Sequence, residues 1–374
     1  PRSCGQDPDF GPCGPRPAVL DAVAGHGVAS IGDSHPRWIE AVAAAAHRRR
    51  GGNELANYLA LLAAELPPRV DRVALAPTDA EALATTLRLA RAASGRPGVL
   101  TFGGAFRHPD ADLREADVPL CVEHDALDYG ACDEPVAGAI AAIASRPDLD
   151  DVGAVLVEPV LRSAGNLLPR RGFAAALQDL CRERGWLLIL DESGTGFGRT
   201  GETFACEAFG VEPDVVVLGN GLGGGFPASA VCAGSSLWEA CALPDPPAVG
   251  GGKWDGPLAC AAGGAALEIV TEPGFLGQVR SVGAHAARRL RELADASLRI
   301  ARPRGIGLAL GFDLVEPESG GVAGWTECEA VFRACRNRGV LIAVTTSRVG
   351  LTPPLAISRE EVDRLFDVIA EVVR

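Results

Sequence analysis

Short apolar runs alternate with longer amphipathic segments through the middle of the chain. The apolar runs are rich in Val, Leu and Ile and cover residues 72–76, 98–102, 154–159, 187–192 and 214–219. Between them, residues 80–94 and 172–184 have the period of amphipathic helices. This alternation predicts βαβ units and therefore an α/β fold with a mostly parallel sheet. Because the runs are uniformly apolar, we expect helices on both faces of that sheet.

The pattern changes after about residue 262. Helical segments at 265–269 and 277–294 are followed by two strand candidates, 308–315 and 339–344. This part predicts a smaller α+β domain. We therefore predict an N-terminal segment, 1–49, that packs with the small domain, a large domain, 50–262, and a C-terminal small domain, 263–374.

Polar side chains follow the apolar runs at the places where the strands are expected to end. Glu158, Asp191, Glu192 and Asn220 each stand directly after or at the end of such a run. Open α/β sheets bind ligands beyond the carboxyl ends of their strands. The sequence therefore predicts that these four side chains face one crevice.

Composition excludes several classes of function. The formal net charge of -13 and the pI near 5.0 argue against a nucleic acid or an anionic membrane surface as partner. No apolar run reaches the roughly 18 residues of a membrane helix, and no secretory leader is apparent, so we expect a cytoplasmic protein. The eleven cysteines form no C-x-x-C pair and the six histidines have no metal-ligand spacing. We expect reduced thiols and no metal site.

Six stretches resemble the class III, or ω-type, aminotransferases, a family of fold type I pyridoxal-phosphate (PLP) enzymes. The longest is "LLILDESGTGFGRTGETFACEAFGVEPDVVVLGNGLGGGFP". The others, in the family's order, are "SIGDSHPRWIEAV", "VEPVLRSAGNLLPRRGF", "WDGPLACAAGGAALEIV", "RGIGLALGFDL" and "GLTPPLAIS". The resemblance implies a large PLP-fold domain with a small α+β domain. It also implies a homodimer with its site at the subunit interface and a small-molecule substrate.

In that family an aspartate at a strand end pairs with the pyridinium nitrogen of the cofactor, and a lysine on a later strand end forms the Schiff base. Asp191 matches the aspartate, and the family's spacing puts the lysine at Asn220. The amide of Asn220 can neither form an imine nor take up a proton at neutral pH. The resemblance thus implies a member without the Schiff-base lysine, by natural divergence or by an introduced substitution.

Other cofactor positions also depart from the family. Where the family has S-G-T at a helix start that holds the phosphate, this chain has Thr78, Asp79 and Ala80. Ser193 and Gly194 replace a valine below the ring and a glutamine near its phenolic oxygen.

The remaining matches concern ring stacking and the subunit interface. Phe106 matches the ring-stacking aromatic, whereas Arg107 replaces a histidine. Lys253, the sole lysine of the chain, replaces a threonine that reaches the phosphate from the other subunit, and Trp254 follows it. Lys253 is either a binding group for an anion, a relocated Schiff-base lysine or a surface residue.

Three functional hypotheses remain open. The first is a repurposed biosynthetic enzyme that uses Asp191, Glu158 and Glu192 for acid–base chemistry, with no cofactor, in the former cofactor cavity. The second is an enzyme that holds PLP or pyridoxamine phosphate (PMP) noncovalently. The third is a noncatalytic ligand-binding or regulatory subunit. The first is preferred because the family's phosphate-binding residues S-G-T are lost. Arg348 is a candidate for binding a substrate carboxylate.

Overall fold

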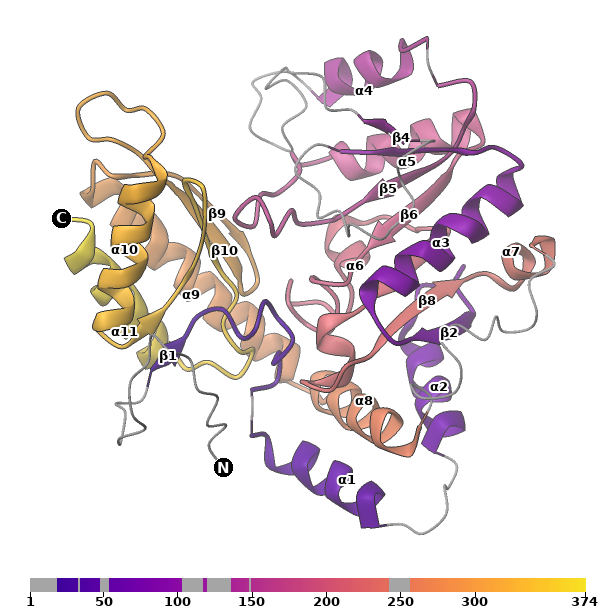
Figure 1. The fold of residues 1–374 in the computed structure, drawn as a ribbon, viewed down its shortest axis with the longest axis horizontal. Helices are drawn as coiled ribbons and strands as arrows, with labels where there is room; N and C mark the ends of the chain where they lie inside the picture. The colour runs from indigo at the N-terminus through magenta and orange to yellow at the C-terminus, as the bar shows by residue number, and fades with distance from the viewer. Residues whose placement is uncertain are drawn as a thin grey trace.

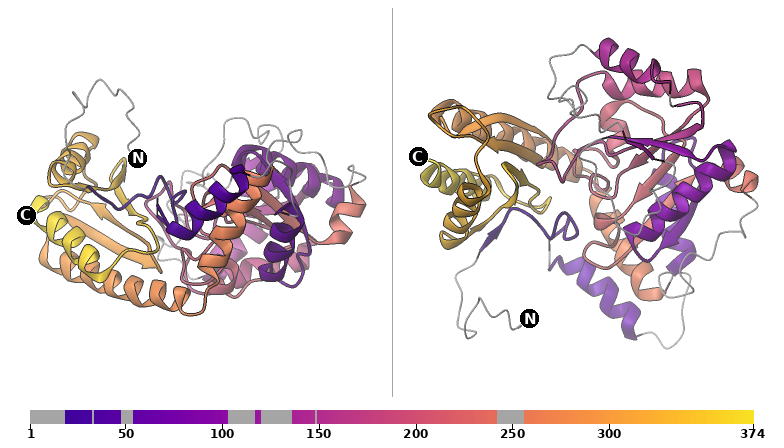
Figure 2. Two further views of the ribbon diagram at one scale, coloured as in Figure 1. Left: turned by 90° about the horizontal axis from the view of Figure 1, so that it is seen from below. Right: turned by 45° about the horizontal axis from the view of Figure 1, so that its top comes forward.

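The computed structural model describes residues 19–32, 34–47, 54–102, 117–119, 136–147, 149–241 and 256–374, with the backbone alone for 117–119. Within these residues the chain forms two lobes (Figure 1). The larger lobe is built on a seven-stranded sheet and the smaller on a four-stranded sheet. Figure 2 shows the same two lobes side by side from two other directions.

The seven-stranded sheet has the order β2-β8-β7-β6-β5-β3-β4. Its strands are β2 Arg72–Ala76, β3 Gly98–Thr101, β4 Asp117–Pro119, β5 Val152–Val157, β6 Leu187–Asp191, β7 Val215–Leu218 and β8 Ser229–Ala233. All neighbouring pairs from β4 to β7 are parallel, whereas β8 runs antiparallel to both β7 and β2. The predicted α/β fold class with a mostly parallel sheet is confirmed.

Both faces of this sheet are covered by helices, as the uniformly apolar strands predict. In β6, Leu188 and Leu190 face one hydrophobic cluster and Ile189 faces another, because successive side chains point to opposite faces. Five helices contribute to the first cluster: α2 Glu54–Glu65, α4 Val136–Ala144, α5 Phe173–Arg184, α6 Ala205–Phe209 and α8 Pro257–Val270. Two helices contribute to the second: α3 Asp79–Ser94 and α7 Ser235–Ala240.

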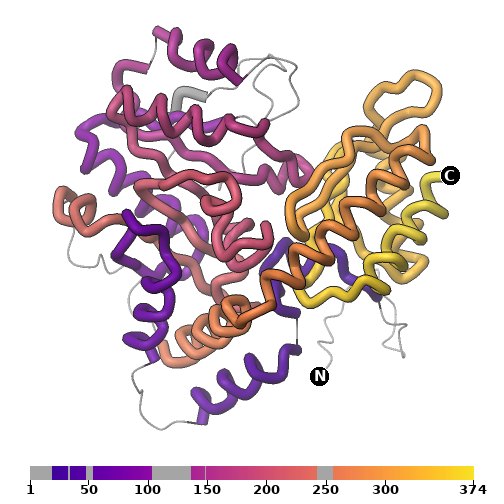
Figure 3. The backbone as a smooth tube through the Cα atoms, turned by 180° about the vertical axis from the view of Figure 1, so that it is seen from behind, coloured from indigo at the N-terminus to yellow at the C-terminus, as the bar shows by residue number. Residues whose placement is uncertain are grey.

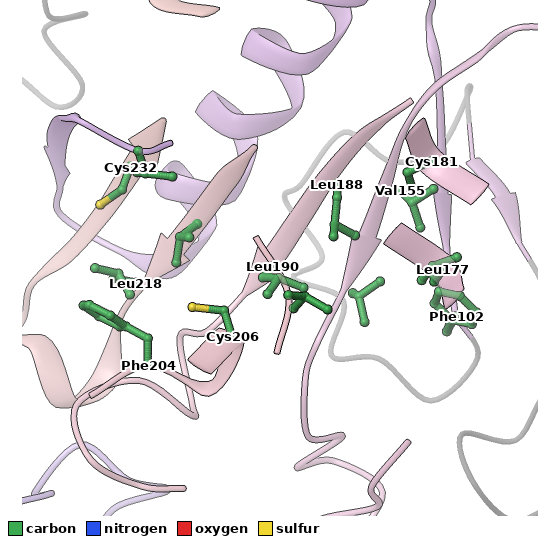
Figure 4. Close-up of a cluster of buried hydrophobic side chains, with 14 of the residues drawn as sticks. Phe102, Val155, Leu177, Cys181, Leu188, Leu190, Phe204, Cys206, Leu218 and Cys232 are labelled. Atoms are coloured by element: carbon green, nitrogen blue, oxygen red, sulfur yellow. The ribbon is translucent and has the colours of Figure 1, made fainter. Parts of the chain in front are cut away.

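Thiols are part of this core. Figure 4 shows Cys181, Cys206 and Cys232 among the apolar side chains of the first cluster. All three are free and buried, and burial raises the pKa of the Cys181 thiol to about 12. These thiols stay protonated at neutral pH and pack as small apolar groups.

The smaller lobe has an antiparallel sheet of order β12-β13-β10-β9. Its elements are β9 Ile300–Ile306, β10 Ala309–Leu314, β11 Val340–Leu341, β12 Ala343–Thr345, β13 Arg348–Leu351 and the helices α9 Phe275–Ala296, α10 Trp325–Asn337 and α11 Arg359–Val372. The helices share one hydrophobic cluster with the sheet. Viewed from behind, the long helix α9 crosses the small lobe and leads back to α8 (Figure 3).

The N-terminal segment contacts both lobes. Strand β1, Leu20–Asp21, pairs in parallel with β11 of the small lobe. Helix α1, Pro36–His47, instead lies against α8 of the large lobe, and the Trp38 indole donates to the Gly223 carbonyl at 3.0 Å. Between them, the His26 carbonyl accepts hydrogen bonds from Arg162 and Asn220, which follow β5 and β7. The domain boundaries given above stay predictions.

No helix among the described residues is both long and apolar enough to cross a membrane.

Candidate active site

Three adjacent parallel strands end at the same edge of the large sheet. Strand β5 leads into Glu158, β6 ends at Asp191, and β7 leads through Gly219 into Asn220. The register pairs Val157 with Leu190 and Asp191 with Val217, so the ends are level. The structure thus brings the strand-end polar residues to one edge, which is where open α/β sheets bind ligands.

Asn220 is the first residue of a short 3-10 helix, η3 Asn220–Gly223, and has a φ of +33°. Asparagine tolerates this left-handed region better than most residues. Its Nδ2 donates to the His26 carbonyl oxygen at 3.4 Å. The side chain therefore contacts the N-terminal segment and offers neither a nucleophile nor a titratable group.

A cavity of about 310 Å³ opens beside Asn220. Its other walls are the start of α3, the segment 226–229 and Val28 of the N-terminal segment. Thr78 is the N-cap of α3, and its Oγ1 accepts from the Glu81 amide at 3.2 Å. The Thr78 cap leaves other amides of the first turn available to a ligand, as at any helix start.

Asp79 contributes a carboxylate to this cavity. Its Oδ1 accepts a hydrogen bond from the Ser229 hydroxyl at 2.5 Å. A Cβ at Gly219 would overlap that same oxygen, so only glycine lets the end of β7 approach the start of α3 so closely. The cavity wall at this point is fixed by Gly219, Asp79 and Ser229 together.

Asp191 is 9% exposed at the end of β6. Among the described residues its carboxylate accepts a single hydrogen bond, from the Ser193 amide to Oδ1 at 3.0 Å. Ser193 is buried as well. The carboxylate is thus oriented by the turn that follows β6 and retains lone pairs for a ligand.

Glu192 is turned away from the cavity. It is 1% exposed, and its two carboxylate oxygens accept from the Ala205 and Cys206 amides at 2.5 and 2.8 Å. These amides begin α6, so Glu192 caps that helix. Glu158 is also buried. The catalytic roles predicted for both residues stay predictions, and the geometry of Glu192 favours a structural one.

We expect Glu192 to make stability depend on pH. Burial raises the pKa of Glu192 from 4.5 to about 7. As pH rises from about 4.5 to about 7, the unfolded chain loses this proton before the folded protein does, so the free energy of unfolding falls. In Glu192→Gln this part of the pH slope should vanish. The amide also places a donor against a backbone N–H, at a cost of about 1–3 kcal/mol.

Urea unfolding at a series of pH values measures both effects. Glu183→Gln, on the exposed face of α5, is the matched control and should keep the wild-type slope. An unchanged slope in Glu192→Gln would contradict the assignment.

Arg348 lies in β13, in an ion cluster of the small lobe. Its Nε is 4.0 Å from Asp313 Oδ1, which accepts from Arg304 Nη1 at 2.8 Å. The same cluster packs on Gly165, where a Cβ would crowd the side chains of both arginines. The structure thus places Arg348 where the lobes meet, and its predicted binding of a carboxylate stays a prediction.

Four residues that the sequence singled out lie outside the described residues: Phe106, Arg107, Lys253 and Trp254. Within the described part of the chain, no group of His, Cys, Asp and Glu side chains could hold a metal ion.

Fold type I pyridoxal-phosphate proteins have such a mostly parallel sheet, with a helix start and a strand-end aspartate at its carboxyl edge. Residues 119–373 match the sequence family described as Aminotransferase class-III, and the chain belongs to that family.

Relatives cover nearly the whole chain. Acetylornithine aminotransferase of Methanothermobacter thermautotrophicus is 32% identical over 95% of this chain and 89% of its own length. The [LysW]-aminoadipate semialdehyde transaminase of Deinococcus radiodurans is 31% identical over 95% of this chain and 82% of its own length. Among solved structures, an amine transaminase from an uncultivated Pseudomonas species, in its PLP-bound internal aldimine form, has a TM-score of 0.82. That structure is 23% identical and covers 95% of this chain and 90% of its own.

These comparisons correct one prediction. The expectation that no cofactor is used is wrong, because the chain belongs to the Aminotransferase class-III family, whose members are PLP-dependent. The prediction took the absence of the S-G-T residues to mean that the phosphate site is absent. Phosphate at a helix start is held by backbone amides and the helix dipole, which α3 retains whatever its side chains are.

Sequence reasoning missed three contributors to the crevice. Ser229 holds Asp79, the His26 carbonyl accepts from Asn220, and Arg162 donates to that same carbonyl. Of these three, only Arg162 could have been found from the sequence. Gly194 stands where the family has glutamine, and a side chain at position 194 would overlap the Arg162 side chain.

Proposed function

We propose that this chain is a class III aminotransferase-family enzyme that binds PLP or PMP noncovalently and acts on a small molecule. The observation that carries the proposal is that Asp191 and Asn220 stand at the ends of two neighbouring strands. The end of β6 presents a carboxylate suited to a pyridinium nitrogen, while the end of β7 presents an amide that forms no imine. In this proposal Asn220 takes the place of the family's lysine.

The described residues fit such a cofactor in its main features. The cavity extends from the start of α3 to Asn220 after β7, and β7 lies next to the strand that ends at Asp191. Asp79 weakens the fit to a phosphate dianion, although Ser229 already donates to its Oδ1. The amides and dipole of α3 favour an anion, so a phosphate would bind there against the charge of one carboxylate. We therefore expect weaker retention of the cofactor than a covalent anchor gives.

When bound, PLP or PMP supplies an electron sink for chemistry at a substrate carbon. The chain's own residues would divide the remaining work. Asp191 would hold the ring nitrogen in its protonated form, and Ser193 would fix the orientation of that carboxylate through its amide. Asn220 can donate a hydrogen bond but carries no proton between substrate atoms. Ordinary transamination through position 220 is therefore excluded from the proposal.

The proposal also includes a homodimer with the site at its interface, a biosynthetic role and a cytoplasmic location. Family membership supports the first, and the names of the relatives support a small-molecule substrate.

Calorimetric titration of the purified protein with PMP tests this function. Wild type should bind PMP, and Asp191→Asn should bind it on the order of ten- to a hundred-fold more weakly, since a charged hydrogen bond is lost. Asp71→Asn is the matched control. Asp71 accepts hydrogen bonds from Ser235 at the start of α7, at the edge of the sheet opposite the crevice. Equal affinity in wild type and Asp191→Asn, or no binding at all, would refute the proposal.

A further inference from the structure

The cavity beside Asn220 has a carboxylate in its wall at the place where a ligand phosphate would lie. Asp79, the first residue of α3, lines this cavity together with Thr78, Ala80 and Ser229. Among the described residues of the cavity wall, Asp79 is the one with a charged side chain. A phosphate held by the amides at the start of α3 would therefore lie close to this carboxylate.

Two strand ends hold Asp79 in this position. The Ser229 hydroxyl donates to its Oδ1 at 2.5 Å, and Ser229 is fixed in turn because it pairs with Ala76 in the sheet. On the other side, a Cβ at Gly219 would overlap the same oxygen, so the end of β7 packs closely against the carboxylate. The Asp79 carboxylate is therefore a packed part of the cavity wall.

The two described hydroxyls of the cavity wall both donate to carboxylates of the chain. Ser229 donates to Asp79, and Thr78 Oγ1 donates to Glu81 Oε2 at 3.4 Å. Because a hydroxyl has a single proton to donate, neither directs its proton to a ligand. A phosphate at this place would meet backbone amides of α3 on one side and a carboxylate on the other.

The charges around Asp79 do not separate it from a bound phosphate. Of the elements that pack against α3, strands β5, β7 and β8 carry no charged side chain. The charged residues of β2 and α7, Arg72 and Glu239, lie toward the opposite edge of the sheet. The next charge along α3, Glu81, is exposed and also negative.

A carboxylate and a phosphate in contact compete for a proton. Two like charges at hydrogen-bond distance do not both stay ionised, and a proton shared between them forms a short, strong hydrogen bond. The second proton of a phosphate monoester leaves with a pKa of about 6, so such a proton is available near neutral pH.

We infer that Asp79 and the phosphate of the bound ligand share one proton, so that the cavity binds phosphate monoesters with uptake of a proton. Asp79 is then a specificity-determining residue, because it selects the singly charged phosphate over the dianion. The inference rests on the proposed function and deepens it by naming the protonation state that the site accepts. Affinity must then fall as pH rises above about 6, because the free ligand loses the proton that the complex retains.

Benzyl phosphate is the probe, because it carries the phosphate group without the ring nitrogen of PMP. In calorimetric titrations of the purified full chain, its affinity should fall about tenfold per pH unit from about pH 6.5 to about pH 8.5. In Asp79→Asn the affinity should stay level over this range, because the amide bears no charge and shares no proton. At about pH 8.5 the variant should thus bind on the order of a hundred-fold more tightly than wild type.

Titrations in buffers with different enthalpies of ionisation count the protons directly. At about pH 8, wild type should take up close to one proton more per bound ligand than Asp79→Asn. Glu81→Gln is the matched control: it removes an exposed carboxylate from the same turn of α3 and should keep the wild-type dependence on pH. An absence of proton uptake by wild type would overturn the inference, and so would an equal pH dependence in wild type and Asp79→Asn.

PMP is titrated into wild type, Asp79→Asn and Asp191→Asn, so that the two proposals can fail separately. Binding of PMP that depends on Asp191, with the same pH dependence in wild type and Asp79→Asn, would support the proposed function and overturn the inference. Proton uptake with benzyl phosphate that depends on Asp79, in a protein whose PMP affinity is unchanged in Asp191→Asn, would support the inference and refute the proposed function.

Discussion

Replacing Asn220 with lysine is expected to give the protein a covalent bond to PLP that the wild type does not form. The backbone at the end of β7 already directs residue 220 into the crevice, beside the cavity and next to the strand that ends at Asp191. A primary amine at this position can condense with the cofactor aldehyde, whereas the amide of asparagine cannot. The nearby charge of Arg162 should lower the pKa of the new lysine and favour its reactive neutral form.

Intact mass after borohydride reduction, together with the visible spectrum, measures this gain. Asn220→Lys incubated with PLP should show a reduced adduct on nearly every chain. Asn220→Gln is the control and should show none. Peptide mapping should place the adduct at residue 220, and an adduct confined to Lys253 would contradict the proposed site.

Replacing Asp313 with asparagine is expected to cost about 3–5 kcal/mol of the free energy of unfolding. Asp313 is 1% exposed, accepts a hydrogen bond from Arg304 at 2.8 Å and forms an ion pair with Arg302 at 2.5 Å. The Arg304 side chain is 9% exposed, so the variant leaves a buried guanidinium without its counterion. Breaking such a pair costs far more than breaking a pair in water, because the remaining charge stays desolvated.

Urea unfolding measures the loss of unfolding free energy in Asp313→Asn, and Asp179→Asn is the control variant. Asp179 pairs with Arg182 at 3.4 Å on the exposed face of α5, and an exposed pair contributes at most about 1 kcal/mol. The two variants should thus differ several-fold in destabilisation. A similar small loss in both would show that the Asp313 cluster is not the buried link that the structure describes.

The fold could be predicted from the sequence wherever local pattern decides it. The apolar runs gave the parallel strands β3, β5, β6 and β7, because a strand buried on both faces is apolar at every position. Strand β8, Ser229–Ala233, was missed. It runs antiparallel between β2 and β7, and that position depends on residues about 150 positions apart, which local pattern cannot report.

The site was predictable only in part, for the same reason. The gathering of Glu158, Asp191 and Asn220 followed from the rule that parallel strands end at one edge. The contacts of Arg162 with His26 and of Ser229 with Asp79 join distant segments and needed the tertiary structure. The cofactor prediction failed because it relied on the side chains at the start of α3, whereas backbone amides bind phosphate at a helix start.

Native mass spectrometry of the PLP-loaded wild type, paired with denaturing mass spectrometry after borohydride treatment, tests the central claim most directly. We expect the native spectrum to show the protein with PLP bound and the denatured spectrum to show the unmodified chain mass. A stoichiometric reduced adduct in the denatured spectrum would contradict the account, because the cofactor would then be held covalently in a chain whose residue 220 is asparagine.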